Sequence, residues 1–422
     1  MTASTKHLLK SYCRYVYYAG AGNFWFENIY PETGCYKIYS VISFSIYFVM
    51  ILLENLAFLF GDFPEVEKKS AMMFAAIHDI ILIKMFLLLY HKSSVRQLNS
   101  EMATVMEAIE EDKLMKKQQM KVQWGITFYV ITVYLSLSAY GVESLRKSIV
   151  EGTPFYTVVT YFPHYQDDSI IASILRVFFY MTWLYMMLPM ISADCMPIIH
   201  LITIAYKFIT LCQHFERIRQ DFDKNVFVMR NEEATKLLKA GYLKGIRMHQ
   251  KLMFLADEIH RVFGITMSLQ VCESSAVAVL LLLRLAVSTN FLVERNIVVC
   301  KSLKYCANFQ LSPHLNLTNA FMTYTFVGSL FFLLALNLWN AGEITYQASL
   351  LANSMFYCGW HLCKMDQRAH NDIRRLVLIG CTQAQKPLIL KAFGIQDLSY
   401  NTFVSVARMT YSIFAVFYQR RE

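Results

Sequence analysis

Residues 401–420, NTFVSVARMTYSIFAVFYQR, form the last apolar stretch of a chain of 422 residues. A helix of roughly 20 mostly apolar residues is needed to cross the hydrocarbon core of a bilayer, so this stretch predicts a short terminal membrane helix. Ser412, Val416 and Gln419 are four and three residues apart, which places them on one helical face. That face can line a pore, or it can simply pack as one side of a peripheral helix.

The composition of the whole chain is that of a membrane protein. The hydrophobic fraction is 56% and the charged fraction 17%, whereas soluble chains average roughly 45–50% and 25%. With only 15 glycines and 8 prolines, long helices are expected rather than turn-rich strands. We therefore expect an all-α integral membrane protein, with residues 1–422 as a single membrane unit and no separate soluble domain.

Apolar runs predict seven spans, and the connecting segments predict their orientation. The spans are expected at 38–60, 71–90, 124–142, 172–196, 262–287, 321–341 and 402–418. Segments 1–36, 91–123, 207–261 and 342–395 would share one side of the membrane, and they hold most of the 40 lysines and arginines. Because basic loops stay inside, we expect a cytoplasmic N-terminus and an extracellular C-terminus.

The predicted outer side carries two further features. The sequence Asn316-Leu317-Thr318 is an N-glycosylation sequon on that side, so Asn316 is a candidate glycosylation site. Cys300 and Cys306 could share an extracellular loop and pair. The ten cysteines otherwise show neither a disulfide framework nor metal-ligand spacing, and no metal or cofactor is expected.

The long cytoplasmic segments have amphipathic helical patterns. Apolar residues in 207–261 and 342–395 recur at helical spacing, as at Phe208, Leu211, Phe215, Ile218 and Phe222. Such faces must be buried, either in a bundle formed by continuations of spans four to six or along the lipid headgroups. We favour the bundle, because the basic residues do not gather in one stripe.

Two acidic residues fall in or at the edge of predicted spans. Glu273 lies near the centre of the fifth span, where it can face a water-filled vestibule or bond a neighbouring helix. Asp194 lies at the end of the fourth span, close to Pro189 and Pro197, where a kink is expected.

The C-terminal residues resemble those of the insect odorant receptors. The matching positions are Ser349-Leu-Leu-Ala352, Tyr357, Trp360-His361, Arg374-Arg375-Leu376, Pro387-Leu-Ile-Leu390, Gly394, Leu398, Phe403-Val-Ser-Val406 and Tyr411-Ser412. They cover about the last 75 residues; the rest of the chain matches by length, span number and orientation. The end of the chain is a degenerate copy of the gustatory-receptor ending, which favours an odorant-tuning subunit.

The resemblance implies an odorant-gated, non-selective cation channel subunit. It implies assembly with odorant co-receptor subunits into a tetramer in the plasma membrane of a sensory neuron dendrite, with mono- and divalent cations as permeating ions and lipid around the subunits. The cytoplasmic helices of 207–261 and 342–395 would form the inter-subunit anchor. Helix 402–418 would line the pore, with Val416 at an apolar constriction, Gln419 near the outer mouth and Ser412 on the same face.

The resemblance also places a pocket for small volatile molecules within the first six spans, residues 38–341. It would lie in the outer halves of the second, third, fourth and sixth spans. The candidate ligand-binding residues there are Met73, Ile77, Tyr134, Leu137, Tyr140, Gly141, Phe179, Tyr180, Trp183, Met322, Tyr324 and Thr325.

Other functions fit less well. A gustatory-type homotetrameric channel is the main alternative, and a G-protein-coupled chemoreceptor is a remote one because the basic residues place the N-terminus inside. The chain has none of the sequence motifs of metalloproteases, serine hydrolases or P-loop nucleotide-binding enzymes, so we expect no enzyme and no nucleic-acid partner.

Overall fold

The computed structural model describes residues 4–63, 65–228, 231–302, 314–363 and 367–419. Only the backbone is described at 65–67, 69–70, 151, 226–228, 231, 282–302, 314–320, 323, 367–369, 414 and 417–419. The helices are α1 (Thr5–Tyr18), α2 (Gly34–Phe60), α3 (Glu65–Tyr90), α4 (Lys92–Thr104), η1 (Glu107–Ile109), α5 (Asp112–Glu151), α6 (Ile170–Val228), α7 (Asn231–Ser302), α8 (His314–Phe356), η2 (Trp360–Leu362), α9 (Gln367–Ala384) and α10 (Tyr400–Gln419). Two-residue strands β1 (Lys391–Ala392) and β2 (Gln396–Asp397) pair antiparallel, a small departure from the all-α expectation.

Six helices in the described part of the chain are long and apolar enough to cross a membrane. They are Gly34–Phe60, Ala71–Tyr90, Asp112–Val150, Ile170–Asn225, Glu232–Leu281 and Tyr324–Leu362, and they contain or overlap the first six predicted spans. The seventh predicted span, 402–418, lies within α10, which is not among the six. Its first half carries Thr402, Ser405 and Arg408, whose polar side chains lower its hydropathy.

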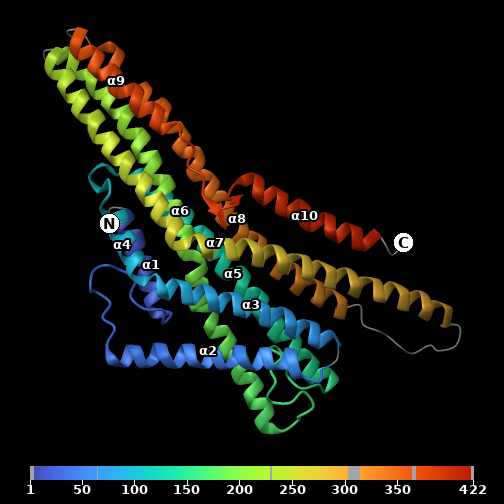
Figure 1. Ribbon diagram of the computed structural model, residues 1–422. Helices are drawn as coiled ribbons and strands as arrows, with labels where there is room; N and C mark the ends of the chain where they lie inside the picture. Colours follow the sequence, from blue (N-terminus) through green and yellow to red (C-terminus); the bar gives the residue numbers. More distant parts are fainter. Residues whose placement is uncertain (1–3, 64, 229–230, 303–313, 364–366, 420–422) are drawn as a thin grey trace.

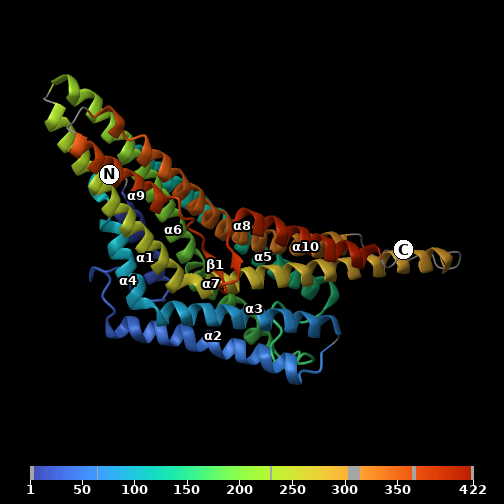
Figure 2. The same ribbon diagram turned by 45° about the horizontal axis from the view of Figure 1, so that its top comes forward.

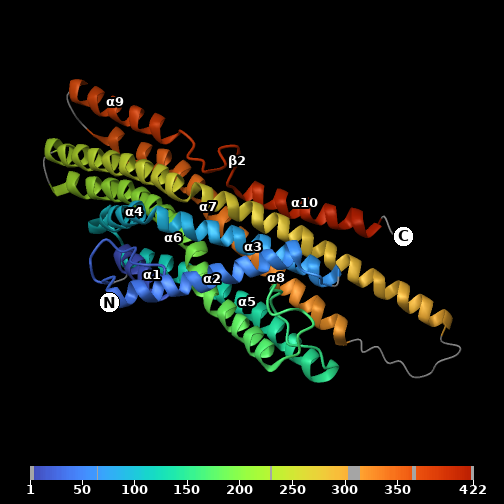
Figure 3. The same cartoon turned by 60° about the horizontal axis from the view of Figure 1, so that its bottom comes forward.

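Helices α6, α7 and α8 are each continuous far beyond a membrane thickness. α6 has 59 residues and α7 has 72, although about 20 suffice for a crossing. At one end of the molecule they lie beside α9, away from α2 and α3 (Figures 1, 2 and 3). This confirms that the fourth to sixth spans continue as helices that pack together.

The predicted amphipathic faces are buried in that helical bundle. Phe208, Leu211 and Phe215 on α6 are fully covered, and so are Leu252, Leu255 and Ile259 on α7 and Leu351 and Met355 on α8. These side chains belong to one continuous hydrophobic core. Burying each large apolar side chain stabilises the fold by roughly 1.5–3 kcal/mol. Pro189 and Pro197 both lie inside α6 without ending it.

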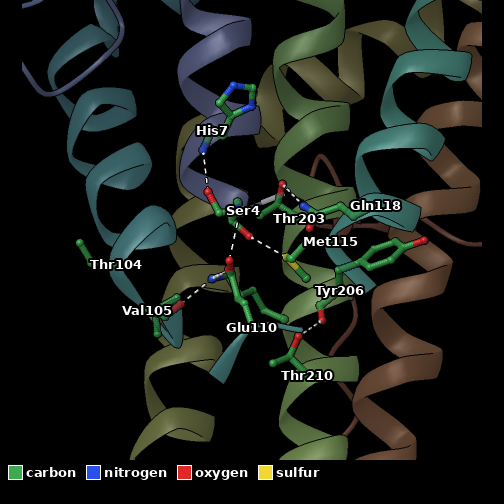
Figure 4. A network of polar contacts seen from close by, with 12 residues as sticks. Ser4, His7, Thr104, Val105, Glu110, Met115, Gln118, Thr203, Tyr206 and Thr210 are labelled. Carbon is green, nitrogen blue, oxygen red and sulfur yellow. Dashed lines mark hydrogen bonds and ion pairs between the residues drawn. The ribbon is translucent and has the colours of Figure 1, made fainter. Parts of the chain in front are cut away.

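A buried polar network fastens the N-terminal helix to the bundle (Figure 4). Glu110, in the connection between α4 and α5, accepts from the Lys207 ammonium at 2.6 Å and from the backbone N–H of Thr5 at 3.2 Å. Lys207 also donates to the Val105 carbonyl, and Gln118 Nε2 donates to Thr203 Oγ1 at 3.2 Å. Both side chains of the Lys207–Glu110 pair are almost fully buried. Each neutralises the charge of the other, which would be costly to bury without a partner.

The β1–β2 hairpin delivers the chain to α10. Gly394 sits in the tight turn with φ of 72°, a conformation that glycine adopts without a steric penalty. The hairpin is anchored by the Phe393 N–H, which donates to Ser268 Oγ on α7 at 2.8 Å. Tyr400 then donates to Glu343 Oε2 on α8 at 2.8 Å. From there α10 runs alongside α7 and α8 (Figures 1 and 3).

Candidate functional site

A cavity of about 40 Å³ lies among α3, α5, α6, α7 and α8. Its apolar walls come from Ile77, Ile81, Val133, Leu137, Met187, Met190, Leu330 and Leu333. Its aromatic residues are Phe74, Tyr129, Tyr140, Trp183 and Phe326, and its polar residues are His78, Ser136, Asp194, Gln270, Glu273 and Ser329. A mostly apolar chamber with a few convergent polar groups is the usual form of a small-molecule site.

Four aromatic rings make one wall of this cavity. The centroids of Phe74 and Trp183 are 5.6 Å apart, and those of Phe74 and Tyr140 are 5.8 Å apart, both in edge-on arrangements. Tyr140 and Trp183 are 6.2 Å apart, and Phe326 lies 6.5 Å from Phe74. Edge-to-face packing at these distances holds each ring by its neighbours, so the wall offers a large contact area with little freedom left to lose on binding.

A buried ionic cluster adjoins the cavity, and Asp194 and Glu273 of this cluster line it. Lys84 Nζ on α3 lies 2.9 Å from Asp194 Oδ1 on α6 and 2.6 Å from Glu273 Oε2 on α7. Lys84 also donates to Gln270 Oε1 at 2.5 Å, and Tyr129 on α5 donates to Asp194 Oδ2 at 3.0 Å. All five side chains are almost completely buried, so the cluster joins four helices through charged groups that have no access to water.

His78 is held as a neutral imidazole. The Trp183 indole N–H, which can only donate, donates to His78 Nε2 at 3.0 Å. His78 Nε2 therefore carries no proton, and the Nδ1–H donates to Glu54 Oε2 at 2.6 Å. The second oxygen of Glu54 has no hydrogen-bond partner among the described residues. His78 thus links the aromatic wall to a carboxylate on α2.

Four of the twelve sequence-predicted ligand residues line this cavity: Ile77, Leu137, Tyr140 and Trp183. The others lie outside its lining, namely Met73, Tyr134, Gly141, Phe179, Tyr180, Met322, Tyr324 and Thr325. Tyr180 and Gly141 are close behind it, since Tyr180 donates to the Leu137 carbonyl at 3.2 Å. Tyr324 is 59% exposed and points away from the core.

Sequence reasoning missed the residues that give the cavity its polarity. The resemblance indicated spans two, three, four and six, and therefore left out Gln270 and Glu273 on α7. Glu273 was nonetheless identifiable as an acid inside a span, and the expectation that it bonds a neighbouring helix is confirmed by its pairing with Lys84. Asp194, expected at a kink, belongs to the same cluster.

The structure describes the side chains of two of the three proposed pore residues on α10, Ser412 and Val416. Ser412 is exposed and Val416 is 53% exposed, whereas Thr402, Val406 and Thr410, on an adjacent face of the helix, are buried. The side chain of Gln419 lies outside the described residues. The Ser412–Val416 face is therefore not covered by the rest of this chain.

Two outer-side predictions are only partly described. Asn316 falls within the first turn of α8, and its side chain is outside the described residues. The same holds for Cys300, which lies in α7, while Cys306 falls in 303–313, outside the described residues altogether. Both remain predictions.

Residues 63–306 and 298–411 match the sequence model of the family described as 7tm odorant receptor. The chain belongs to the 7tm odorant receptor family. The match extends the C-terminal resemblance over most of the receptor, including every helix that lines the cavity. The receptor is therefore a multi-pass membrane protein of an insect odorant receptor family, which is a family of receptors and not of enzymes.

Solved structures agree with this fold. The receptor is similar to olfactory receptor OR5 of the insect Machilis hrabei in complex with eugenol, with a TM-score of 0.72 and 11% identity over 97% of both chains. A second structure of OR5 from Machilis hrabei gives a TM-score of 0.71, again with 11% identity over 97% of both chains. No curated protein sequence matches the receptor significantly. At this identity the likeness concerns the fold alone.

Proposed function

We propose that the receptor is an odorant-gated, non-selective cation channel subunit whose ligands are small volatile molecules bound in the cavity between α3, α5, α6, α7 and α8. The observation that carries the proposal is the cavity itself, an enclosed aromatic chamber inside the apolar part of a chain of the odorant receptor family. Its volume of about 40 Å³ is small, so it must widen when an odorant enters.

The same helices provide a route from the cavity to α10. Gln270 and Glu273 line the cavity from α7, and α7 is also a helix against which α10 packs. Ser268, two residues before Gln270 on α7, holds the hairpin that leads into α10. A ligand that favours a different position of α7 can therefore displace α10, and it does so only to the extent that it binds that arrangement more tightly.

The remaining features of the proposal follow from the basic residues and the family. The N-terminus lies in the cytoplasm and the C-terminus outside, in the plasma membrane of a sensory neuron. Segments 207–261 and 342–395 form the anchor between subunits, and 402–418 lines the pore through Ser412, Val416 and Gln419. Odorant co-receptor subunits complete a hetero-oligomer, a tetramer, that passes mono- and divalent cations.

The test is to express the chain in a heterologous cell with and without an insect co-receptor, and to record currents against a panel of volatiles. We expect a rapid inward current that requires both chains. Cells with the co-receptor alone give the background for each volatile. Current from the chain alone would support the gustatory-type homotetramer instead, and surface-expressed protein that is silent throughout the panel would contradict the channel proposal.

A matched pair of variants locates the ligand. Tyr140→Ala removes a ring from the cavity wall, whereas Tyr324→Ala removes an exposed ring of the same kind outside it. We expect the half-maximal odorant concentration to rise about tenfold for Tyr140→Ala, which corresponds to roughly 1.4 kcal/mol. Tyr324→Ala should stay close to wild type. Equal effects of the two variants would place the ligand elsewhere.

A further inference from the structure

The ionic cluster beside the cavity contains two carboxyl groups but only one ammonium group among the described residues. Asp194 and Glu273 both line the cavity, and one cation, Lys84, neutralises them from behind. Asp194 is well satisfied, since Lys84 reaches one of its oxygens and Tyr129 the other. The Glu273 carboxylate is paired with one cation among the described residues, the Lys84 ammonium, which lies beside Oε2. The cavity wall therefore offers a carboxylate with capacity for a second partner.

The aromatic rings that line the same cavity are suited to a cationic ligand. The negative faces of aromatic rings attract an organic cation, and a cage of such rings is a common way to hold an ammonium group. Here Phe74, Tyr140 and Trp183 pack edge to face around the chamber that Glu273 lines. His78 is neutral, so it adds no positive charge to this side.

We propose that the cavity selects small organic amines, bound as ammonium ions between the Glu273 carboxylate and the aromatic wall. This inference rests on the proposed function, because it takes the cavity to be the odorant site. The ammonium of the ligand supplies the second cation that the Asp194–Glu273–Lys84 cluster lacks. An isosteric alcohol fills the same space but brings no cation to the second carboxyl group, and a buried carboxylate that lacks a cation of its own is costly.

The alternative is that Asp194 and Glu273 serve only to hold the helices together. The variant Glu273→Gln separates the two explanations. It leaves Lys84 and Asp194 as a one-to-one pair and keeps a side chain of similar volume at position 273, so we expect the fold to be retained. Glu258→Gln is the matched control, since Glu258 lies on the same helix and pairs with the exposed Arg261 far from the cavity.

The experiment measures two pairs of isosteres, butylamine with 1-butanol and benzylamine with benzyl alcohol, on the receptor expressed with its co-receptor. The wild type should respond to each amine at a concentration about tenfold or more below that of its alcohol, because a hydrogen bond between two charged groups is stronger than one to a neutral hydroxyl. Glu273→Gln should lose that preference, so that each amine acts no more strongly than its alcohol. Glu258→Gln should keep it.

The outcomes separate the inference from the function beneath it. If alcohols act as well as amines on the wild type, or if Glu273→Gln weakens both members of each pair equally, amine selection is overturned and the odorant channel stands. If no compound in the four or in a broad volatile panel gives a current, or raises the melting temperature of the purified complex, the proposed function fails with it. The wild-type comparison needs no variant, so it decides the matter even if Glu273→Gln folds poorly.

Discussion

The ammonium of Lys84 lies 2.9 Å from Oδ1 of Asp194, although the two residues are 110 positions apart in the chain. Together with Glu273 they form an ionic contact between α3, α6 and α7, where each side chain is at least 95% buried. A buried pair adds little when it is complete, but removing one member leaves a charge without a partner in a medium of low polarity. This relationship determines the first prediction.

Lys84→Met should destabilise the receptor strongly. It leaves Asp194 and Glu273 as two buried carboxylates without a cation, and breaking a buried pair in this way costs about 3–5 kcal/mol. The melting temperature of the detergent-purified protein measures the effect. Lys251→Met is the control, since Lys251 pairs with Glu101 near the surface and should change stability by less than about 1 kcal/mol.

A compensating variant tests the reason for that loss. Lys84→Met combined with Asp194→Asn and Glu273→Gln removes all three charges, and it should recover much of the stability lost by Lys84→Met alone. A Lys84→Met receptor that melts at the wild-type temperature would show that the cluster is not held by its cation.

Val416→Ser should raise the current that flows without ligand. If the Ser412–Val416 face lines the pore, the hydroxyl allows water to remain in a constriction that an apolar ring keeps dry. Val404→Ser is the matched control, because Val404 lies on the same helix with 52% exposure, close to the 53% of Val416. Whole-cell recording in the presence of the co-receptor compares the two. Unchanged basal and evoked currents in Val416→Ser would argue against a gate there.

Gly141→Ala should alter odorant responses through Tyr180. A Cβ at Gly141 would lie 2.2 Å from Tyr180 Oη, so the ring must move and give up its hydrogen bond to the Leu137 carbonyl, behind the cavity wall. We expect a loss of about 1–3 kcal/mol in stability from this overpacking, together with a changed rank order of ligands. Gly328→Ala on α8, where a Cβ meets nothing within 4 Å, should be neutral.

The coupling between the two residues can be measured directly. Gly141→Ala with Tyr180→Ala removes the clash, so the double variant should be more stable than the sum of the two single effects predicts. Strict additivity would mean that the added methyl group acts elsewhere.

The contact between Glu101 on α4 and Lys251 on α7 should make stability depend on pH. Burial alone raises the pKa of Glu101, but hydrogen bonds from Lys251 Nζ at 2.5 Å and Gln97 Nε2 at 2.9 Å outweigh it and hold the pKa below its ordinary value. A lowered carboxyl pKa stabilises the folded state above the ordinary pKa, and this contribution is lost as the pH falls through the folded-state pKa.

Glu101→Gln should therefore be less stable than wild type at neutral pH. The difference should shrink as the pH falls below the ordinary carboxyl pKa and vanish below the lowered folded-state pKa. Because the pair is partly exposed to solvent, the difference should be no more than about 0.2–1 kcal/mol. Melting temperatures across the pH range measure it. A difference that grows on acidification would contradict the sign of the pKa shift.

Much of the architecture could be predicted from local patterns. Apolar length identified the first six spans, and helical spacing identified buried faces such as Phe208, Leu211 and Phe215. These predictions succeed because a bilayer or a bundle imposes the same requirement at every turn of a helix. Glu273 was identifiable for the same reason, since a charge inside a span needs a partner.

The cavity could not be predicted in this way. Of the residues chosen from spans two, three, four and six, Tyr324 proved exposed and Tyr180 lay behind the wall, because nothing local in a long apolar helix reveals which side faces a neighbouring helix and which faces lipid. Hydrophobicity distinguishes buried from aqueous surroundings, but lipid and protein interior are equally apolar.

The sequence by itself determined that this chain is a helical membrane protein of the odorant receptor family, and which of its first six apolar segments are long enough to cross a membrane. Only the tertiary structure decided that Lys84, Asp194 and Glu273 meet, and that Phe74, Tyr140 and Trp183 enclose the space beside them. The reason is physical. Membrane crossing depends on the composition of each segment alone, whereas the partner of a buried charge depends on how separate helices are rotated and packed against one another.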